Sequence, residues 1–169
     1  MKKLLISTLM ILTLGGINML SAKSMEMFDT DGKSYKINAV NDEFKIKEAE
    51  GKVVFLEFFG LNCPACQATM PHLINLKEKY KDSIKIMAIE VQKHDVDPIN
   101  AYKKMYGINY TTFSNYDVGD VVRYIADSSG WKGAIPFTVI IDAKGIVQFV
   151  EAGIISEDKL NEYVEKFSK

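Results

Sequence analysis

Apolar residues recur with two different periods along this chain, and the changes of period divide it into strands and helices. The stretches 52–60 and 83–91 are almost continuously apolar and rich in β-branched and aromatic residues. Such runs are typical of strands buried on both faces in a sheet that helices cover. The expected strands are 34–40, 52–60, 83–91, 136–142 and 146–153, the last two joined as a hairpin by a turn at 143–145.

Between these strands the apolar residues adopt helical spacing. After a start at Pro64, apolar residues such as Met70 and Leu73 mark one face of a predicted helix whose end carries several lysines. Proline suits a first helical turn and lysines suit the negative end of the helix dipole, whereas Pro71 inside the helix is expected to kink it. The expected helices are 64–80, 97–106, 118–127 and a last one capped by Ser156. The order strand, helix, strand, helix, hairpin, helix predicts an α/β sandwich, in which a mixed sheet has helices on both faces.

The first 22 residues differ in character from the rest. Lys2 and Lys3 precede an uncharged apolar stretch, 4–20, which small residues follow. This order predicts a secretory signal peptide at 1–22 and a single domain at 23–169. An uncleaved membrane anchor is the alternative, because the stretch reaches the lower end of the length of a spanning helix. In both cases we expect the folded part to be exported to the periplasm; no cysteine lies near the cleavage site, which excludes a lipoprotein anchor.

Composition and charge narrow the possible functions. The chain has a formal net charge of −1, and without residues 1–22 it carries 19 basic and 22 acidic side chains, a net charge of −3. A mildly acidic domain offers no basic surface for nucleic acid, so no nucleic-acid partner is expected. With 47% hydrophobic residues the chain can build a full core, and we expect a monomer.

Cys63 and Cys66 are the only cysteines, and they allow three interpretations. As a structural disulfide, they would close a four-residue loop and stabilise the fold by only about 2 kcal/mol, against about 4.7 kcal/mol for a 100-residue loop. A structural zinc site needs four ligands, and the two histidines, His72 and His94, are far apart in sequence. We expect His72 on a helix surface and His94 in a loop, and no metal site. Two thiolates alone suit Cu(I), which leaves a copper carrier open.

The third interpretation is a redox pair. Cys63 is expected at the N-terminal end of the helix that Pro64 begins, where free backbone N–H groups and the helix dipole stabilise a thiolate. Cys66 follows one turn later, close enough to attack a mixed disulfide formed at Cys63 and release the partner. Cys63 is then the nucleophile and Cys66 the resolving thiol.

Two further residues are candidates for this site. Glu57 interrupts an apolar strand six residues before Cys63, and a buried carboxylate is costly unless it has a function. Beneath the cysteines it would exchange the proton of Cys66 through a water, with its pKa raised by burial; the alternative is an edge position in solvent. Pro136 opens a strongly β-forming run, either as an ordinary turn proline or as a cis proline that faces the cysteines and leaves nearby backbone free for an extended substrate.

These motifs resemble the thioredoxin superfamily. The similarity lies in "FLEFFGLNCPACQATMP" and "IPFTVIID", with the acid six residues before the first cysteine, the Cys-X-X-Cys pair, the proline five residues after it and the Pro-x-Thr-x-x-x-Asp strand. The inserted helix near 97–106 and the leader resemble the exported TlpA/ResA/CcmG branch. The resemblance implies a thioredoxin-like three-layer sandwich and an exported thiol–disulfide oxidoreductase, with Cys63 and Cys66 as redox pair, Glu57 as buried acid and Pro136 as cis proline.

The resemblance also sets expectations about partners. It implies protein thiol or disulfide substrates, no bound cofactor, and a reducing direction that requires a membrane electron donor. A disulfide-introducing oxidant similar to DsbA is the alternative, and a Cu(I) carrier or a redox-inert binding module on the same fold also stays open. Asn62 stands where the superfamily usually has tryptophan, and Trp131 is too distant in sequence to be recognised as its substitute. A peroxiredoxin would need threonine at the position of Gly60 and is excluded.

Overall fold

The computed structural model describes residues 22–169, and its centre is a five-stranded mixed sheet in the order β6-β5-β4-β7-β8. Strands β4 and β5 run parallel, as do β5 and β6, while β7 is antiparallel to both β4 and β8. The strands are β4 (Val53–Phe59), β5 (Ile84–Glu90), β6 (Thr111–Ser114), β7 (Phe137–Ile141) and β8 (Val147–Ala152). Every residue of β4 and β7 is buried, which agrees with the continuous apolar runs in the sequence.

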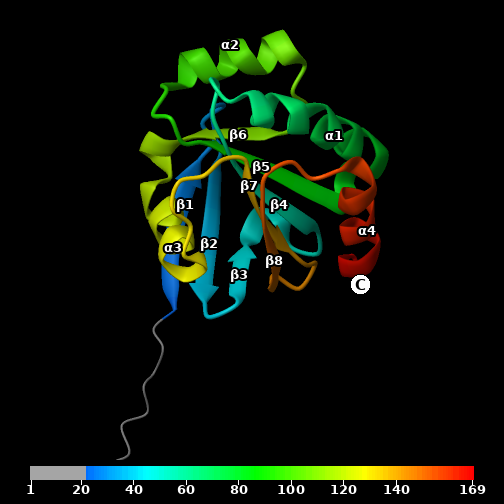
Figure 1. Cartoon of the computed structure of the whole chain (residues 1–169). Helices are drawn as coiled ribbons and strands as arrows, with labels where there is room; N and C mark the ends of the chain where they lie inside the picture. The colour runs from blue at the N-terminus through cyan, green and yellow to red at the C-terminus, as the bar shows by residue number, and fades with distance from the viewer. Residues whose placement is uncertain (1–21) are drawn as a thin grey trace, which may run out of the picture.

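Helices cover both faces of this sheet (Figure 1). The helices are α1 (Pro64–Tyr80), α2 (Val96–Tyr106), α3 (Gly119–Ser129) and α4 (Glu157–Phe167). One core cluster joins alternate residues of β4 and β5 to the buried faces of α1 and α4, and the opposite cluster contains the buried face of α3. The predicted thioredoxin-like sandwich is therefore confirmed, and α1 places its N-terminus at the end of β4.

A second, antiparallel sheet in the order β1-β2-β3 covers the α3 face together with that helix. Its strands are β1 (Lys23–Phe28), β2 (Ser34–Val40) and β3 (Glu43–Ile46). The sequence predicted β2 alone. Met25 and Met27 point into the core from β1, and Phe44 and Ile46 from β3, so each strand buries one face by alternation.

Other boundaries also differ from the predictions. Strand β6 is four residues long and was not predicted, because so short a run shows no clear period. Pro71 lies inside the continuous helix α1; the kink expected there stays a prediction. The predicted signal peptide, except for Ala22, lies outside the described residues. Within residues 22–169, no helix is long and apolar enough to cross a membrane.

Candidate active site

Cys63 and Cys66 lie where β4 passes into α1, and they are joined by a disulfide. The S–S distance is 2.15 Å and the two Cα atoms are 5.2 Å apart. Cys63 is the N-cap residue of the helix, since its carbonyl oxygen accepts from the backbone N–H of Gln67 at 3.0 Å. Cys63 is 7% exposed and Cys66 2%, so the first cysteine is the more accessible of two nearly buried sulfurs.

The helix start surrounds the Cys63 sulfur with positive potential. The backbone N–H of Cys66 donates to Cys63 Sγ at 3.1 Å. Pro64 occupies the first turn, which contains no acidic side chain. Free N–H groups and the helix dipole stabilise negative charge at such a position, typically by about 0.3–1 kcal/mol. The local structure therefore favours a thiolate at Cys63 once the disulfide is reduced.

The segment that contains Pro136 approaches Cys63 at Ile135, the residue before the proline. The Ile135–Pro136 peptide bond is cis, and the carbonyl oxygen of Ile135 lies 3.9 Å from Cys63 Sγ. The carbonyl of Pro136 accepts from the backbone N–H of Gly153, which ties the segment to the end of β8. Among residues 22–169 the backbone N–H of Ile135 has no hydrogen-bond partner. An extended peptide lying across Cys63 can therefore pair with Ile135.

Glu57 lies on the face of β4 that α1 covers, in the register of Phe55 and Phe59, whose side chains pack in the same cluster as both cysteines. It is 2% exposed, so the alternative of an edge position in solvent is wrong. Burial raises the pKa of its carboxyl from 4.5 to about 8, and no described residue donates a hydrogen bond to it. At neutral pH Glu57 is therefore largely protonated and able to exchange a proton.

Two tyrosines near Glu57 were not recognised from the sequence. Burial raises the pKa of Tyr110 well above its ordinary value, and the Glu57 charge raises it further. Burial also raises the pKa of Tyr102, with smaller contributions that include Glu57. Tyr102 comes from α2, packs against Phe59 at 6.3 Å between ring centroids, and buries its hydroxyl without a partner among residues 22–169. Helix α2 thus adds a polar group to the apolar surroundings of the carboxyl.

Trp131 lies on the opposite side of the sheet and supports the loop before Pro136. Its ring centroid is 4.9 Å from that of Phe58 and 5.7 Å from that of Phe137. Its indole Nε1–H donates to the carbonyl of Ala134 at 2.6 Å. These contacts depend on the tertiary fold, and no local sequence signal indicates them.

A buried carboxylate at the end of β5 organises the loop opposite Asn62. Glu90 is fully buried and accepts from the backbone N–H of Gln92 at 3.0 Å, from that of His94 at 2.9 Å and from His94 Nδ1 at 2.9 Å. The Gln92 side chain in turn accepts from the backbone N–H of Asn62 at 3.0 Å. It also fills the space that a side chain at Gly60 would need. The residue before Cys63 is therefore held by a hydrogen bond from this loop.

The histidines have structural contacts. His72 Nδ1–H donates to the carbonyl oxygen of Ile155 at 2.9 Å and links α1 to the segment before α4, so His72 is half-buried rather than a freely exposed surface residue. His94 lies in the loop after β5, paired with Glu90. In the described part of the chain, no group of three His, Cys, Asp or Glu residues is arranged to hold a metal ion.

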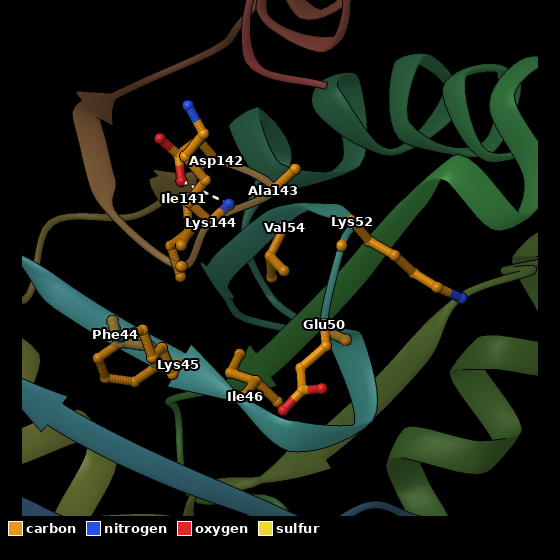
Figure 2. A pocket seen from close by; sticks show the side chains of 13 residues that line it. Phe44, Lys45, Ile46, Glu50, Lys52, Val54, Ile141, Asp142, Ala143 and Lys144 are labelled. Carbon is orange, nitrogen blue, oxygen red and sulfur yellow. Dashed lines mark hydrogen bonds between the residues drawn. The ribbon is translucent and has the colours of Figure 1, made fainter. Parts of the chain in front are cut away.

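A pocket of about 250 Å³ lies between the end of β3, the start of β4 and the end of β7, with Val54 and Ile141 among its walls (Figure 2). Both residues lie at the end of the central sheet opposite the cysteines, because Val54 pairs with Ile141 at the beginning of β4. This pocket does not belong to the redox site.

Comparison with known proteins places the chain among thiol-active relatives. Residues 21–150 match the AhpC/TSA family. The chain belongs to the AhpC/TSA family. It is 28% identical over 125 residues to the thiol-disulfide oxidoreductase ResA of Halalkalibacterium halodurans, covering 73% of this chain and 67% of that protein. It is 26% identical over 144 residues to ResA of Bacillus subtilis, covering 85% and 72%.

A solved structure agrees with the sequence relatives at the level of fold. The thioredoxin-family thiol:disulfide interchange protein of Chlorobium tepidum TLS superposes with a TM-score of 0.68 at 21% identity, covering 88% of this chain and 95% of that one. The expected membership of the thioredoxin superfamily, in its ResA/CcmG-like branch, is thus confirmed. So is the expected class of enzyme: the chain is a thiol–disulfide oxidoreductase.

Proposed function

We propose that the chain is an exported, periplasmic reductant of protein disulfides, and that Cys63, Cys66, Glu57 and Pro136 carry the reaction. The observation that supports the site most directly is the position of Cys63. It is the N-cap of α1 and the more exposed of the two sulfurs, and its Sγ lies 3.9 Å from the carbonyl next to the cis proline. A nucleophile and a free backbone edge for the substrate thus meet at one place.

In the proposed first step, the Cys63 thiolate attacks one sulfur of a substrate disulfide. A mixed disulfide forms between Cys63 and the substrate, and the other substrate sulfur leaves as a thiolate. The helix N-terminus stabilises the attacking thiolate, and the substrate backbone pairs with Ile135. The substrate is an extended segment of a protein, because both groups act on backbone and sulfur rather than on a particular side chain.

In the second step, the ionised form of Glu57, a minor fraction at neutral pH, accepts the proton of Cys66, and the Cys66 thiolate attacks Cys63 Sγ. The Cys63–Cys66 disulfide forms, and the second substrate thiolate leaves and is protonated. Two electrons pass from the cysteine pair to the substrate. Glu57 suits the proton transfer because burial raises its pKa to about 8, close to the ordinary pKa of a thiol.

The reducing direction and the location rest on the ResA/CcmG resemblance and on the leader-like residues 1–22. An exported reductant needs its own source of electrons, and we propose a dithiol protein in the membrane as the donor. For a reductant of this kind, the proposed substrates are exported proteins whose cysteines must stay reduced, for example apocytochromes.

The test is the reduction potential of the Cys63–Cys66 couple in a protein of residues 22–169, equilibrated with thiol buffers. A potential of about −250 mV or lower, near that of thioredoxin, supports a reductant. A potential near about −120 mV, the value for DsbA, would make the chain an oxidant and overturn the proposed direction.

A further inference from the structure

The end of the central sheet opposite the disulfide contains a polar cavity of about 480 Å³. It is walled by the start of β5 and of β6, the last turns of α1 and α2, and the turn between β1 and β2. Register places it at this end, since Ile84 at the start of β5 pairs with Val53 at the start of β4, whereas the cysteines follow the end of β4. The lysines that line it are Lys33, Lys52, Lys77, Lys85 and Lys103.

Lys85 occupies the centre of this group, and its charge has no ion-pair partner among residues 22–169. Its ammonium group donates to Thr111 Oγ1 at 2.6 Å and to the Tyr35 hydroxyl at 3.1 Å, and lies 4.9 Å from the centre of the Tyr35 ring. An ammonium group has three N–H donors, so one remains available. Thr111 also lines the cavity, and its hydroxyl, which accepts from Lys85, can turn its hydrogen either toward the Tyr35 oxygen or toward a ligand.

The surroundings of Lys85 are predominantly positive. Its pKa is lowered from 10.5 to about 8, mainly by burial and then by the charges of Lys33, Lys77 and Lys52, while Asp29 acts in the opposite direction. Lysines are seldom placed around one another without an anion, because each added charge raises the cost of the others.

The acids of the cavity do not balance these lysines. Three line it, Asp31, Glu48 and Asp82, against the five lysines. Asp31 pairs with Lys103 at 3.2 Å, and Glu48 accepts from the backbone N–H of Lys36 at 2.9 Å. Among the lining residues the lysines therefore exceed the acids by two, with Asp29 acting on Lys85 from outside the lining, on a domain whose residues 23–169 carry a net charge of −3.

We propose that this cavity binds a phosphate group, held by the Lys85 ammonium and the Thr111 hydroxyl with Lys33, Lys52 and Lys77 around it. A dianion matches the excess of two charges, and lysine binds phosphate as a point charge. The volume exceeds the need of inorganic phosphate alone, so the organic part of a phosphate monoester fits as well. Binding raises the pKa of Lys85, because the charge of the anion opposes the effect of burial and of the neighbouring lysines.

The experiment is a calorimetric titration of the oxidised protein with inorganic phosphate, and separately with glycerol 2-phosphate, at constant ionic strength set by chloride. Saturable binding of one anion per chain is expected at pH 7. Tighter binding of the ester would identify a phosphorylated small molecule as the ligand, and equal or tighter binding of inorganic phosphate would identify the free ion. No saturable heat with either probe at tens of millimolar, roughly the range of weak anion sites, overturns the proposal.

Matched variants assign the binding to the cavity. Lys85→Met should weaken phosphate binding by about tenfold or more, the effect of losing one charge-assisted hydrogen bond. Lys104→Met, one residue from Lys103 but exposed and outside the cavity, removes the same charge and should leave binding unchanged. Because Lys85→Met also removes two internal hydrogen bonds, Lys33→Met provides a second variant at an exposed position. Unchanged affinity in Lys33→Met and Lys85→Met, or equal loss in Lys104→Met, would refute the site.

Discussion

Replacing Glu57 by glutamine should make the protein more stable at alkaline pH, by an amount that the burial of this carboxyl sets. The pKa of Glu57 is 4.5 in the unfolded chain and about 8 in the folded protein. Between these values the folded state holds a proton that the unfolded state has lost, so the free energy of unfolding decreases by about 1.36 kcal/mol for each pH unit. The stabilisation by the buried acid is complete below pH 4.5 and is lost as pH rises to about 8. Over the whole interval the change amounts to about 5 kcal/mol.

Glutamine keeps the shape of the side chain and cannot ionise, which isolates this contribution. The assay is urea unfolding of the oxidised wild type and of Glu57→Gln at a series of pH values from 5 to 9. Other titrating groups cancel in the difference between the two proteins. We expect the difference to move in favour of the variant by several kcal/mol across this range and to level off above about pH 8. A difference that stays constant with pH would show that Glu57 is not a buried acid with a raised pKa, and the proton transfer proposed for it would fail too.

Three other substitutions test the site. Cys66→Ser should accumulate mixed disulfides at Cys63 in mass spectra of non-reduced samples, and adducts in Cys63→Ser instead would reverse the two roles. Trp131→Phe loses the hydrogen bond to Ala134 and should lower the rate of insulin reduction by about fivefold, the equivalent of about 1 kcal/mol. The reduction potential should not change, and a shifted potential would contradict a purely positioning role. Glu90→Gln should lower the free energy of unfolding in urea by about 2 kcal/mol, because both carboxylate oxygens accept from N–H groups and the variant replaces one of them with an NH2 group that cannot accept. A loss within about 0.5 kcal/mol, as at an ordinary surface position, would argue against this network.

The continuous apolar runs in the sequence predicted the main strands of the central sheet, because these strands are buried on both faces. The runs 52–60 and 83–91 contain β4 and β5, and the helix predicted at 64–80 has the bounds of α1. Prediction failed where an element depends on distant partners. Strand β6 is defined by its pairing with β5 rather than by its own four residues. The alternation of Met25 and Met27 is consistent with β1, but it lies in a polar, mixed stretch directly after the predicted leader, for which no strand was predicted.

The residues of the candidate site also differ in whether the sequence alone could predict them. Cys63 and Cys66 are adjacent on one helical turn, so spacing alone placed them together. Trp131 and Tyr102 reach the surroundings of the site through the packing of a loop and of α2, which no local pattern encodes. Their contributions follow only from the folded structure.

A charge within an apolar strand is an informative signal in this chain, although the sequence does not tell what the charge does. The signal led to Glu57, and it applies equally to Lys85 and Glu90 in β5. The structure separates the three by their partners. Glu90 has three N–H donors, so its burial is explained by the loop that it holds.

Among residues 22–169, Glu57 has no hydrogen-bond donor, and Lys85 has two hydroxyl partners but no carboxylate. Glu57 is fully buried and Lys85 is half-buried, and a charge removed from water with incomplete partners costs free energy that folding must supply. Each of the two residues has a proposed use: proton transfer at Glu57 and anion binding at Lys85. A charge with incomplete partners thus marks both ends of the central sheet, the end with the cysteines and the end with the polar cavity around Lys85. By the same criterion, Glu90 has a structural role only.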